Sequence, residues 1–370
     1  MLTIAVKYRP FPDQVAKLPA GIRVRRVAPQ NMPPPQPVAN LVTEALNTPI
    51  GSATLPEIIH TKCTGPLEKS SQELRVVILC DDHTRITPVQ VVLPFVFGTL
   101  LEQGILPSNI TLLVAGGSHR LITPEELEVK FGSDILATYN VVLHDWENVA
   151  AMASLGEIIA IGGDSIEVKV DPLVKQADLL IGVGNIIPHE IAGFAGGYKI
   201  IIPGISTEET VGKVHWLSTR VPIDKRLGTV SNPIRDAINQ GGALVGLDFL
   251  INTVLNRAGE VVGVFCGDPL RAHAEGCGLS RDIFAVPAVP ADIVIADCYP
   301  EETDFWTSSK VVIHAKGFVR QGGTLIACAA CPEGVCPTHP QILEMCYQAP
   351  EVLEETFLQL PGSRYNRLSA

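Results

Sequence analysis

Positive charge is in short supply in this sequence. Its 370 residues include 28 lysines and arginines against 39 aspartates and glutamates, which gives a formal net charge of −11. A surface that binds nucleic acid needs a basic face, so this class of function is disfavoured. No apolar run approaches the roughly 20 residues needed to cross a bilayer, and we expect no membrane association. The N-terminal stretch MLTIAVKYRP lacks the long apolar segment and cleavage site of a signal peptide.

A paired cysteine pattern is also lacking. The nine cysteines are odd in number and scattered, which argues against a disulfide framework and predicts a cytoplasmic protein with reduced thiols. One cluster, CAACPEGVC (328–336), has C-x2-C spacing at Cys328 and Cys331, and Cys336 and Cys346 could complete a zinc or iron–sulfur site. Cys328 lies inside a predicted buried strand, where free cysteine is a common small hydrophobe, and no second C-x2-C pair follows. A metal site in this cluster is therefore disfavoured.

What the chain does contain is a regular alternation of short apolar runs with polar loops and helix-like segments. Such alternation predicts βαβ units around a parallel sheet that is buried on both faces. In an open parallel sheet, ligands bind outside the carboxyl ends of the strands, and three of the four loops there carry a histidine. We therefore expect one shared crevice at that edge. The four predicted strands are RVVILC (75–80), NITLLVA (109–115), NVVLH (140–144) and ADLLIGVG (177–184).

A second α/β unit is expected late in the chain. ADIVIAD (291–297) is typical of a strand, the segment 308–322 of a helix, and GTLIACAA (323–330) of the next strand. The fold class expected is α/β, with two domains that each have a largely parallel sheet flanked by helices. We predict a first domain over 1–275, a smaller one over 285–350, and a C-terminal helix over 351–370 that could pack back on the first domain.

The stretch PHEIAGFAGGYK (188–199) contains a histidine, three glycines and a lysine. Lys199 is flanked by a tyrosine and isoleucines, and an apolar setting lowers the pKa of a lysine and makes its nucleophilic form accessible. Gly193, Gly196 and Gly197 would let the backbone approach a ligand or adopt positive φ. The stretch does not fit a Walker A loop, so a nucleoside triphosphate is disfavoured. The alternative is a glycine turn followed by a lysine that reaches solvent.

Beyond this stretch, Ser206 and Glu209 have the spacing of a capping box, which predicts a helix from about Thr207. His215 would then lie about two turns into the helix. A rigid helix suits a metal ligand, because the imidazole must be held in a fixed orientation. The alternative is a histidine packed on a core face beside Trp216.

Other candidates follow the predicted strands. His119 and His189 could form an acid/base pair, two zinc ligands, or two structural histidines. Arg85 and Lys310 could anchor a carboxylate, and a solvated surface cation is the alternative for each. The pair His144–Asp145 could orient a ligand at a strand end.

Taken together, these motifs resemble the nickel-pincer lactate racemase family. The matching residues are DDHTRITP (81–88), GGSHR (116–120), PHEIAGFAGGYK with His215, and, in the second domain, Asp304 and Lys310. The resemblance runs from about residue 75 to about residue 335. It implies two α/β domains with the active site in the cleft between them.

The resemblance also implies a cofactor and roles for individual residues. The cofactor would be a nickel-pincer nucleotide, a pyridinium-3-thioamide-5-thiocarboxylic acid mononucleotide, joined covalently to Lys199 and with its nickel bound by His215. Enzymes that make this cofactor would be needed for activation. His119 and His189 would be the catalytic acid and base. Residues near helix N-termini, Thr84 and Ser118, are candidates for the cofactor's phosphate.

Around the substrate, the resemblance implies Asp82, Arg85, Lys310 and the residue at 307. Thr307 is a departure, because many members of the family have glutamine three residues before the lysine that matches Lys310. Threonine is shorter, so a substrate larger than lactate, such as a dicarboxylate or a sugar acid, would fit the vacated space.

The predicted activity is racemisation or epimerisation of a 2-hydroxy acid by reversible hydride transfer through a 2-keto acid. Two alternatives stay open: a zinc-dependent hydrolase that uses His119, His189 and His215, and a non-catalytic cofactor-binding protein. The hydrolase lacks an H-E-x-x-H signature and leaves Lys199 without a role. A carrier would not need two histidines at one edge.

Overall fold

The computed structural model describes residues 2–8, 11–30, 32–66, 68–299, 301–340, 342–345 and 348–359. The described residues of Pro29–Phe284 form one compact unit, and those of Met1–Ala28 together with Ala285–Leu360 form the other. We expected the first 28 residues in the N-terminal domain, whereas their contacts group them with the C-terminal part of the chain.

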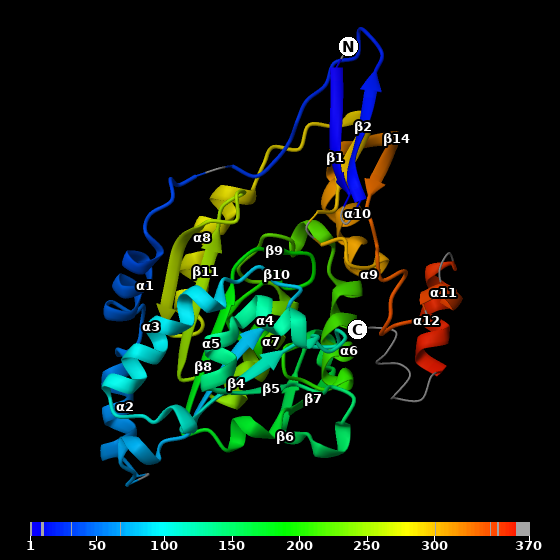
Figure 1. Cartoon of the computed structure of the whole chain (residues 1–370). Helices are drawn as coiled ribbons and strands as arrows, with labels where there is room; N and C mark the ends of the chain where they lie inside the picture. Colours follow the sequence, from blue (N-terminus) through cyan, green and yellow to red (C-terminus); the bar gives the residue numbers. More distant parts are fainter. Residues whose placement is uncertain are drawn as a thin grey trace. The chain divides into compact units, whose positions relative to one another are not determined.

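The larger unit is built on a six-stranded sheet (Figure 1). The order is β12-β11-β8-β3-β4-β5, and all neighbours are parallel except β12, which pairs antiparallel with β11. The mixed α/β fold with a largely parallel central sheet, predicted from the sequence, is confirmed. The strand bounds are β3 (Val76–Asp81), β4 (Ile110–Ala115), β5 (Asn140–Leu143), β8 (Leu179–Asn185), β11 (Phe249–Leu255) and β12 (Val261–Gly267).

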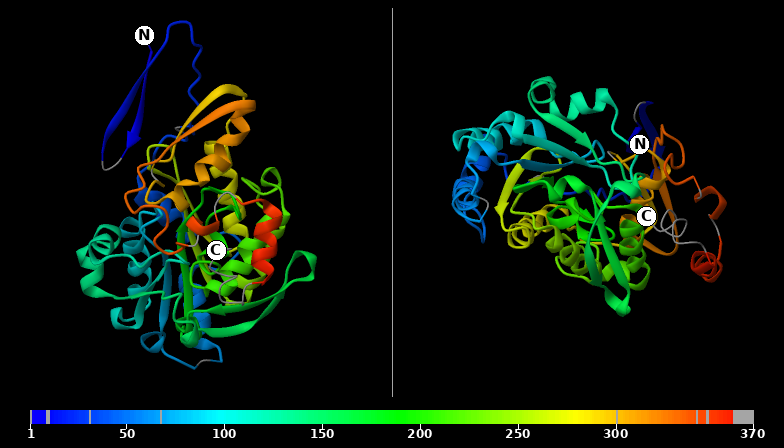
Figure 2. Two further views of the ribbon diagram at one scale, coloured as in Figure 1. Left: turned by 90° about the vertical axis from the view of Figure 1, so that its right-hand side faces the viewer. Right: turned by 90° about the horizontal axis from the view of Figure 1, so that it is seen from below.

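Both faces of this sheet are covered, as strands with no polar face require. Along β3, Val76, Ile78 and Cys80 face one core, whereas Val77 and Leu79 face the other. The first core is closed by α1 (Val38–Asn47), α2 (Leu55–Thr64), α3 (Val89–Glu102), α4 (Pro124–Phe131) and α5 (Ser133–Thr138). The second core is closed by α6 (Glu208–Trp216), α7 (Pro233–Val245), α8 (Arg271–Phe284) and the antiparallel hairpin β6 (Ala153–Ile159)–β7 (Ser165–Val170), which can be followed in Figure 2.

Short elements carry the glycine-rich stretch at the carboxyl edge of β8. β9 (Pro188–His189) pairs antiparallel with β10 (Gly193–Phe194), and a 3₁₀ turn over Gly197–Ile200 follows. The sheet therefore delivers this stretch and the loops after β3 and β4 to the same edge, because the carboxyl ends of parallel neighbours lie together.

The smaller unit holds a two-stranded parallel sheet of β13 (Ala291–Asp297) and β14 (Val319–Cys328), with α9 (Phe305–Ser308) and α10 (Lys310–Ala315) between them in sequence. β1 (Leu2–Tyr8) pairs antiparallel with β2 (Phe11–Leu18). The helix expected over 308–322 ends at Ala315, because the chain enters β14 at Val319 and pairs with β13. Further along the chain lie α11 (Ile342–Met345) and α12 (Pro350–Gln359); the remainder of the predicted C-terminal helix, 360–370, lies outside the described residues.

Candidate active site

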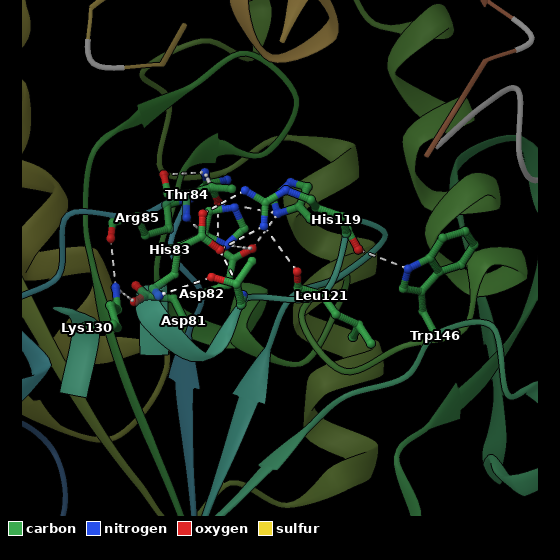
Figure 3. Close-up of polar contacts among 12 residues, drawn as sticks. Asp81, Asp82, His83, Thr84, Arg85, His119, Leu121, Lys130 and Trp146 are labelled. Atoms are coloured by element: carbon green, nitrogen blue, oxygen red, sulfur yellow. Dashed lines mark hydrogen bonds and ion pairs between the residues drawn. The ribbon is translucent and has the colours of Figure 1, made fainter. Parts of the chain in front are cut away.

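The loop after β3 places a buried carboxylate against a histidine (Figure 3). Asp82 is 3% exposed, and its Oδ2 lies 2.7 Å from Nδ1 of His119. Its Oδ1 accepts hydrogen bonds from the backbone N–H and the hydroxyl of Thr84, at 3.1 and 2.6 Å. Burial by itself would raise the pKa of Asp82, but His119 and Arg85 outweigh it and hold that pKa well below its usual range. Asp82, which the resemblance placed at the substrate, contacts the predicted catalytic histidine.

Two further contacts fix the position of His119. Trp146 donates from Nε1 to the backbone oxygen of His119 at 3.0 Å. In the same loop, Gly117 donates its N–H to the carbonyl of Gly204 at 2.9 Å, which ties the loop after β4 to the segment that follows Lys199. His119 is thus held both through its ring and through its backbone.

His83 was not singled out from the sequence. Its Nδ1 lies 3.9 Å from Oδ2 of Asp82, so His83 and His119 flank the same carboxylate oxygen. Burial lowers the pKa of His83, and nearby carboxylates offset this only in part. The one sequence signal that could have identified His83 is its position directly after Asp82.

Arg85 is positioned by its own loop and by a buried lysine beneath it. Its Nη1 donates to the hydroxyl of Thr84 at 3.0 Å. Lys130, on α4, donates 2.7 Å bonds to the carbonyl of Arg85 and to Oδ1 of Asp81, and the hydroxyl of Thr87 donates to the other oxygen of Asp81. Lys130 and Asp81 are 9% and 8% exposed, so this is a buried ion pair that braces the loop.

At His189, Nδ1 is a hydrogen-bond acceptor, whereas at His119 it faces a carboxylate. Nδ1 of His189 accepts the backbone N–H groups of Ile191 and Ala192, at 3.1 and 3.3 Å. Oε2 of Glu190 lies 3.7 Å from the same nitrogen. Both side chains are buried, with 8% and 10% of their surface exposed.

The glycine-rich stretch is clamped by three buried side chains that the sequence reasoning missed. Arg235, on α7, donates to the carbonyls of Ala192, Phe194 and Gly196. Asn252, on β11, accepts the N–H of Gly197 at 2.8 Å, and His273, on α8, lies 2.9 Å from the carbonyl of Ala195. Burial lowers the pKa of Arg235 to about 10 and that of His273 to about 3. No local motif marks these residues, because each acts across a long sequence separation.

These clamps explain why glycine occupies the turn before Lys199. Gly196 and Gly197 have φ of 78° and 62°, a region in which L side chains are strained. A Cβ on Gly197 would lie 2.8 Å from Cγ of His273, and one on Gly196 would lie 2.7 Å from Oδ1 of Asn252. The turn presents Lys199, which is half-buried, on the 3₁₀ segment.

His215 lies on α6, as predicted, in the eighth position of a helix that begins at Glu208. The predicted capping box at Ser206 is wrong by one residue. Thr207 is the N-cap and accepts the N–H of Thr210. The hydroxyl of Ser206 donates instead to the carbonyl of Ile201 at 2.8 Å, which withdraws it from the helix end. His215 is half-buried.

In the smaller unit, Thr307 is engaged locally. Its hydroxyl bonds Oδ1 of Asp304 at 2.8 Å, and its N–H donates to the same oxygen at 2.6 Å. Thr307 is 8% exposed and completes the N-terminal cap of α9. Nζ of Lys310 lies 2.7 Å from Oε2 of Glu301. Lys310, which was predicted to anchor the carboxylate of a substrate, is therefore paired with a carboxylate of the protein itself.

The remaining candidates fall into place as follows. His144 lies 3.1 Å from the carbonyl of Ser206 and 3.3 Å from Asp171, and its side chain is fully buried, so it joins segments of the fold. This contradicts the suggestion that His144 orients a ligand. Of the two residues predicted to contact the cofactor's phosphate, Thr84 donates its hydroxyl hydrogen to Asp82, and Ser118 is buried.

Across the described part of the chain, no group of three or more His, Cys, Asp or Glu side chains is arranged to hold a metal ion. The cysteines at 328, 331 and 336 are free, and Cys346 lies outside the described residues. Among the helices that the structure describes, none is long and apolar enough to span a membrane.

Comparison with known proteins gives consistent matches. Residues 13–225 match the lactate racemase N-terminal domain family. The chain is 31% identical over 298 residues to a lactate racemase of Thermoanaerobacterium thermosaccharolyticum and 32% identical over 297 residues to one of Lactiplantibacillus plantarum. These alignments cover 80% and 79% of this chain but only 66% of each relative, just under two thirds of its length.

Two solved structures are also similar. The lactate racemase apoprotein of T. thermosaccharolyticum superposes with a TM-score of 0.80 at 26% identity, covering 100% of this chain and 85% of that one. A protein from Thermotoga maritima superposes with a TM-score of 0.68 at 25% identity, covering 86% and 82%.

Proposed function

Because the chain belongs to the lactate racemase family, we propose that it is an isomerase that racemises or epimerises a small 2-hydroxy acid. The observation that carries this proposal is the contact between the buried Asp82 and the partly exposed His119, with 2.7 Å between Oδ2 and Nδ1. A carboxylate that accepts the proton of Nδ1 fixes the tautomer of the ring, so we propose that proton exchange with a substrate hydroxyl takes place at Nε2. The curated relatives are named lactate racemases, so lactate is the first substrate to test.

The residues present fit a tethered nickel-pincer nucleotide. Gly196 and Gly197 hold the turn before Lys199 at positive φ, and the half-buried Lys199 that follows is the tether that we propose. We propose His215 as the one nickel ligand from the protein. A cofactor that brings its own metal donors needs only one such ligand. When bound, this cofactor would supply the acceptor that takes and returns the C2 hydrogen as hydride.

The protein's own residues would then handle charge and protons. His119 would take the hydroxyl proton at Nε2, and the anionic Asp82 would stabilise the imidazolium that forms. Removal of the C2 hydrogen gives a planar 2-keto acid, so hydride can return to either face. For the opposite hand, His189 in its protonated form would give the new alkoxide its proton and become neutral, which is the reverse of the step at His119. Arg85 and Lys310 are the proposed carboxylate anchors. Thr84 and Ser118 remain the proposed phosphate contacts, and enzymes that make the cofactor are the expected partners.

The zinc hydrolase has no support from the described residues, because His119 directs Nδ1 at a carboxylate and no three-ligand group is formed. Thr307 bears on substrate choice. Its hydroxyl bonds Asp304, so it contributes little length where the family has glutamine, and larger acids belong in the substrate panel.

The test is an enantiomer-resolved assay on protein expressed together with the cofactor-making enzymes. We expect a single enantiomer of lactate or a larger 2-hydroxy acid to become racemic. His119→Ala and His189→Ala should abolish turnover while intact mass still shows the adduct on Lys199, whereas the exposed control His60→Ala should behave as wild type. Near-normal turnover in either active-site variant would refute the assignment of the pair.

A further inference from the structure

The two histidines differ in the hydrogen bonds that their Nδ1 atoms make. Oδ2 of Asp82 lies 2.7 Å from Nδ1 of His119, and an ionised carboxylate can only accept a hydrogen bond. Oδ1 of Asp82 also accepts two hydrogen bonds from Thr84. The pKa of Asp82 lies well below its usual range, because its interactions with His119 and Arg85 outweigh its burial, so the carboxylate is ionised. Nδ1 of His119 therefore carries a proton, and Nε2 is the nitrogen that can accept one.

At His189 the situation is reversed. Two backbone N–H groups, from Ile191 and Ala192, point at Nδ1 at 3.1 and 3.3 Å. A ring nitrogen that accepts hydrogen bonds cannot carry a proton, so the proton of the neutral ring must be on Nε2. In this state His189 donates a hydrogen bond from Nε2 and cannot act as a base there.

We propose that His119 and His189 hold opposite tautomers in the resting protein, so that His119 is the ready base, His189 is the ready hydrogen-bond donor, and Glu190 is the positioning residue that lets His189 change tautomer. The catalytic part of this inference rests on the proposed function. Only the enantiomer whose hydroxyl reaches His119 can start to react without a prior proton shift.

Glu190 enters because His189 must serve the other enantiomer. For Nε2 to accept a proton, the ring proton must first move from Nε2 to Nδ1, with no net gain or loss of protons. Nδ1 then becomes a donor and must leave the two N–H groups. The carboxylate of Glu190, with Oε2 at 3.7 Å from Nδ1 and 10% of its side chain exposed, is placed to accept that new N–H. Each histidine thus has a buried carboxylate beside Nδ1, at 2.7 Å in His119 and at 3.7 Å in His189.

The first test reads the tautomers directly by ¹⁵N NMR on histidine-labelled protein, with signals assigned through His119→Gln and His189→Gln. We expect protonated Nδ1 in His119 and protonated Nε2 in His189. Asp82→Asn should release the His119 tautomer and leave His189 unchanged, and the exposed control Asp134→Asn should change neither. The same tautomer in both histidines would overturn the proposal. This readout needs no cofactor and no turnover, so a protein with opposite tautomers that fails to racemise would refute the proposed function alone.

The second test addresses Glu190 in the loaded enzyme. Glu190→Gln keeps the size of the side chain but cannot stabilise a proton at Nδ1, so kcat/KM should fall about tenfold or more, while the His189 spectrum of the resting protein is unchanged. The fall in kcat/KM must be the same for the two enantiomers of lactate. They have equal free energy, so their equilibrium constant, which is the ratio of the two kcat/KM values, is one. Glu190→Asp should recover part of the rate, and the exposed control Glu102→Gln should lose none. Wild-type turnover in Glu190→Gln would overturn the role of Glu190.

Discussion

The replacement Asp82→Asn tests the active-site reasoning at one atom. The carboxylate is 3% exposed and its Oδ2 lies 2.7 Å from Nδ1 of His119. Asparagine has the same shape, and its oxygen can still accept the N–H of Thr84. What it lacks is the negative charge that fixes the proton on Nδ1 and stabilises the imidazolium. The variant should therefore fold, load cofactor and lose turnover.

The expected loss follows from that one bond. A hydrogen bond to a charged group contributes about 1.5–3 kcal/mol, and each 1.36 kcal/mol is a factor of ten in rate. Loss of this bond alone should lower kcat by about 10- to 10²-fold. Because the asparagine oxygen stays with the N–H of Thr84, its N–H₂ takes the place of Oδ2 and faces Nδ1, which favours the wrong tautomer of His119 and makes the loss larger. In the serine protease triad, where the same replacement has this effect, it reaches about 10⁴-fold.

The assay is the initial rate of conversion of one lactate enantiomer to the other, normalised to the fraction of protein that carries the Lys199 adduct by intact mass. Asp134→Asn, an exposed aspartate on α5, is the matched control. A loss of less than about threefold in Asp82→Asn, at equal loading, would refute the view that this carboxylate sets the proton position of His119.

Three further predictions concern stability and are checked by urea unfolding. Arg120 donates two hydrogen bonds to the carboxylate of Glu126, at 2.8 and 2.7 Å, and they are the main reason that the pKa of Glu126 is lowered to about 2. A lowered folded-state pKa contributes stability above about pH 4.5 that is lost as pH falls toward 2. Wild type should therefore exceed Glu126→Gln at pH 7, and the two should converge near pH 2; a gap that widens in acid would be the wrong sign. Lys130→Met leaves the buried Asp81 carboxylate uncompensated and should cost about 3–5 kcal/mol, with Asp81→Asn in the same chain recovering much of it; additive losses would argue against a coupled pair. Gly193→Ala should cost more than Gly246→Ala, because φ is near 80° at both but only Gly193 lacks space for a Cβ; equal costs would contradict the clash.

The sequence was informative where function depends on local pattern. The buried runs predicted β3, β4, β5 and β8, and the rule that loops gather at their carboxyl ends predicted that the histidine loops share an edge. The glycines before Lys199 were assigned the right property, since Gly196 and Gly197 have positive φ and close neighbours. Periodicity and turn chemistry depend on a few adjacent residues, so both could be predicted from the sequence alone.

What the sequence did not predict depends on contacts between distant segments. Arg235, Asn252 and His273 clamp the glycine-rich stretch from three elements, and nothing local distinguishes them from ordinary helix and strand residues. Ser206 was predicted to cap a helix, but its hydroxyl donates to the backbone carbonyl of Ile201 instead. Asp82 looked like a substrate contact, and only the fold shows its oxygen at His119.

The most direct measurement is the time course of optical purity when the loaded protein is incubated with pure L-lactate, or with the preferred acid from the panel, labelled with deuterium at C2. We expect a racemic end point with the deuterium retained at C2, because it would leave and return as deuteride. His119→Ala and His189→Ala should show no change in optical purity. Persistent optical purity in the loaded wild type across the panel, or racemisation with complete exchange of deuterium into water, would contradict this expectation.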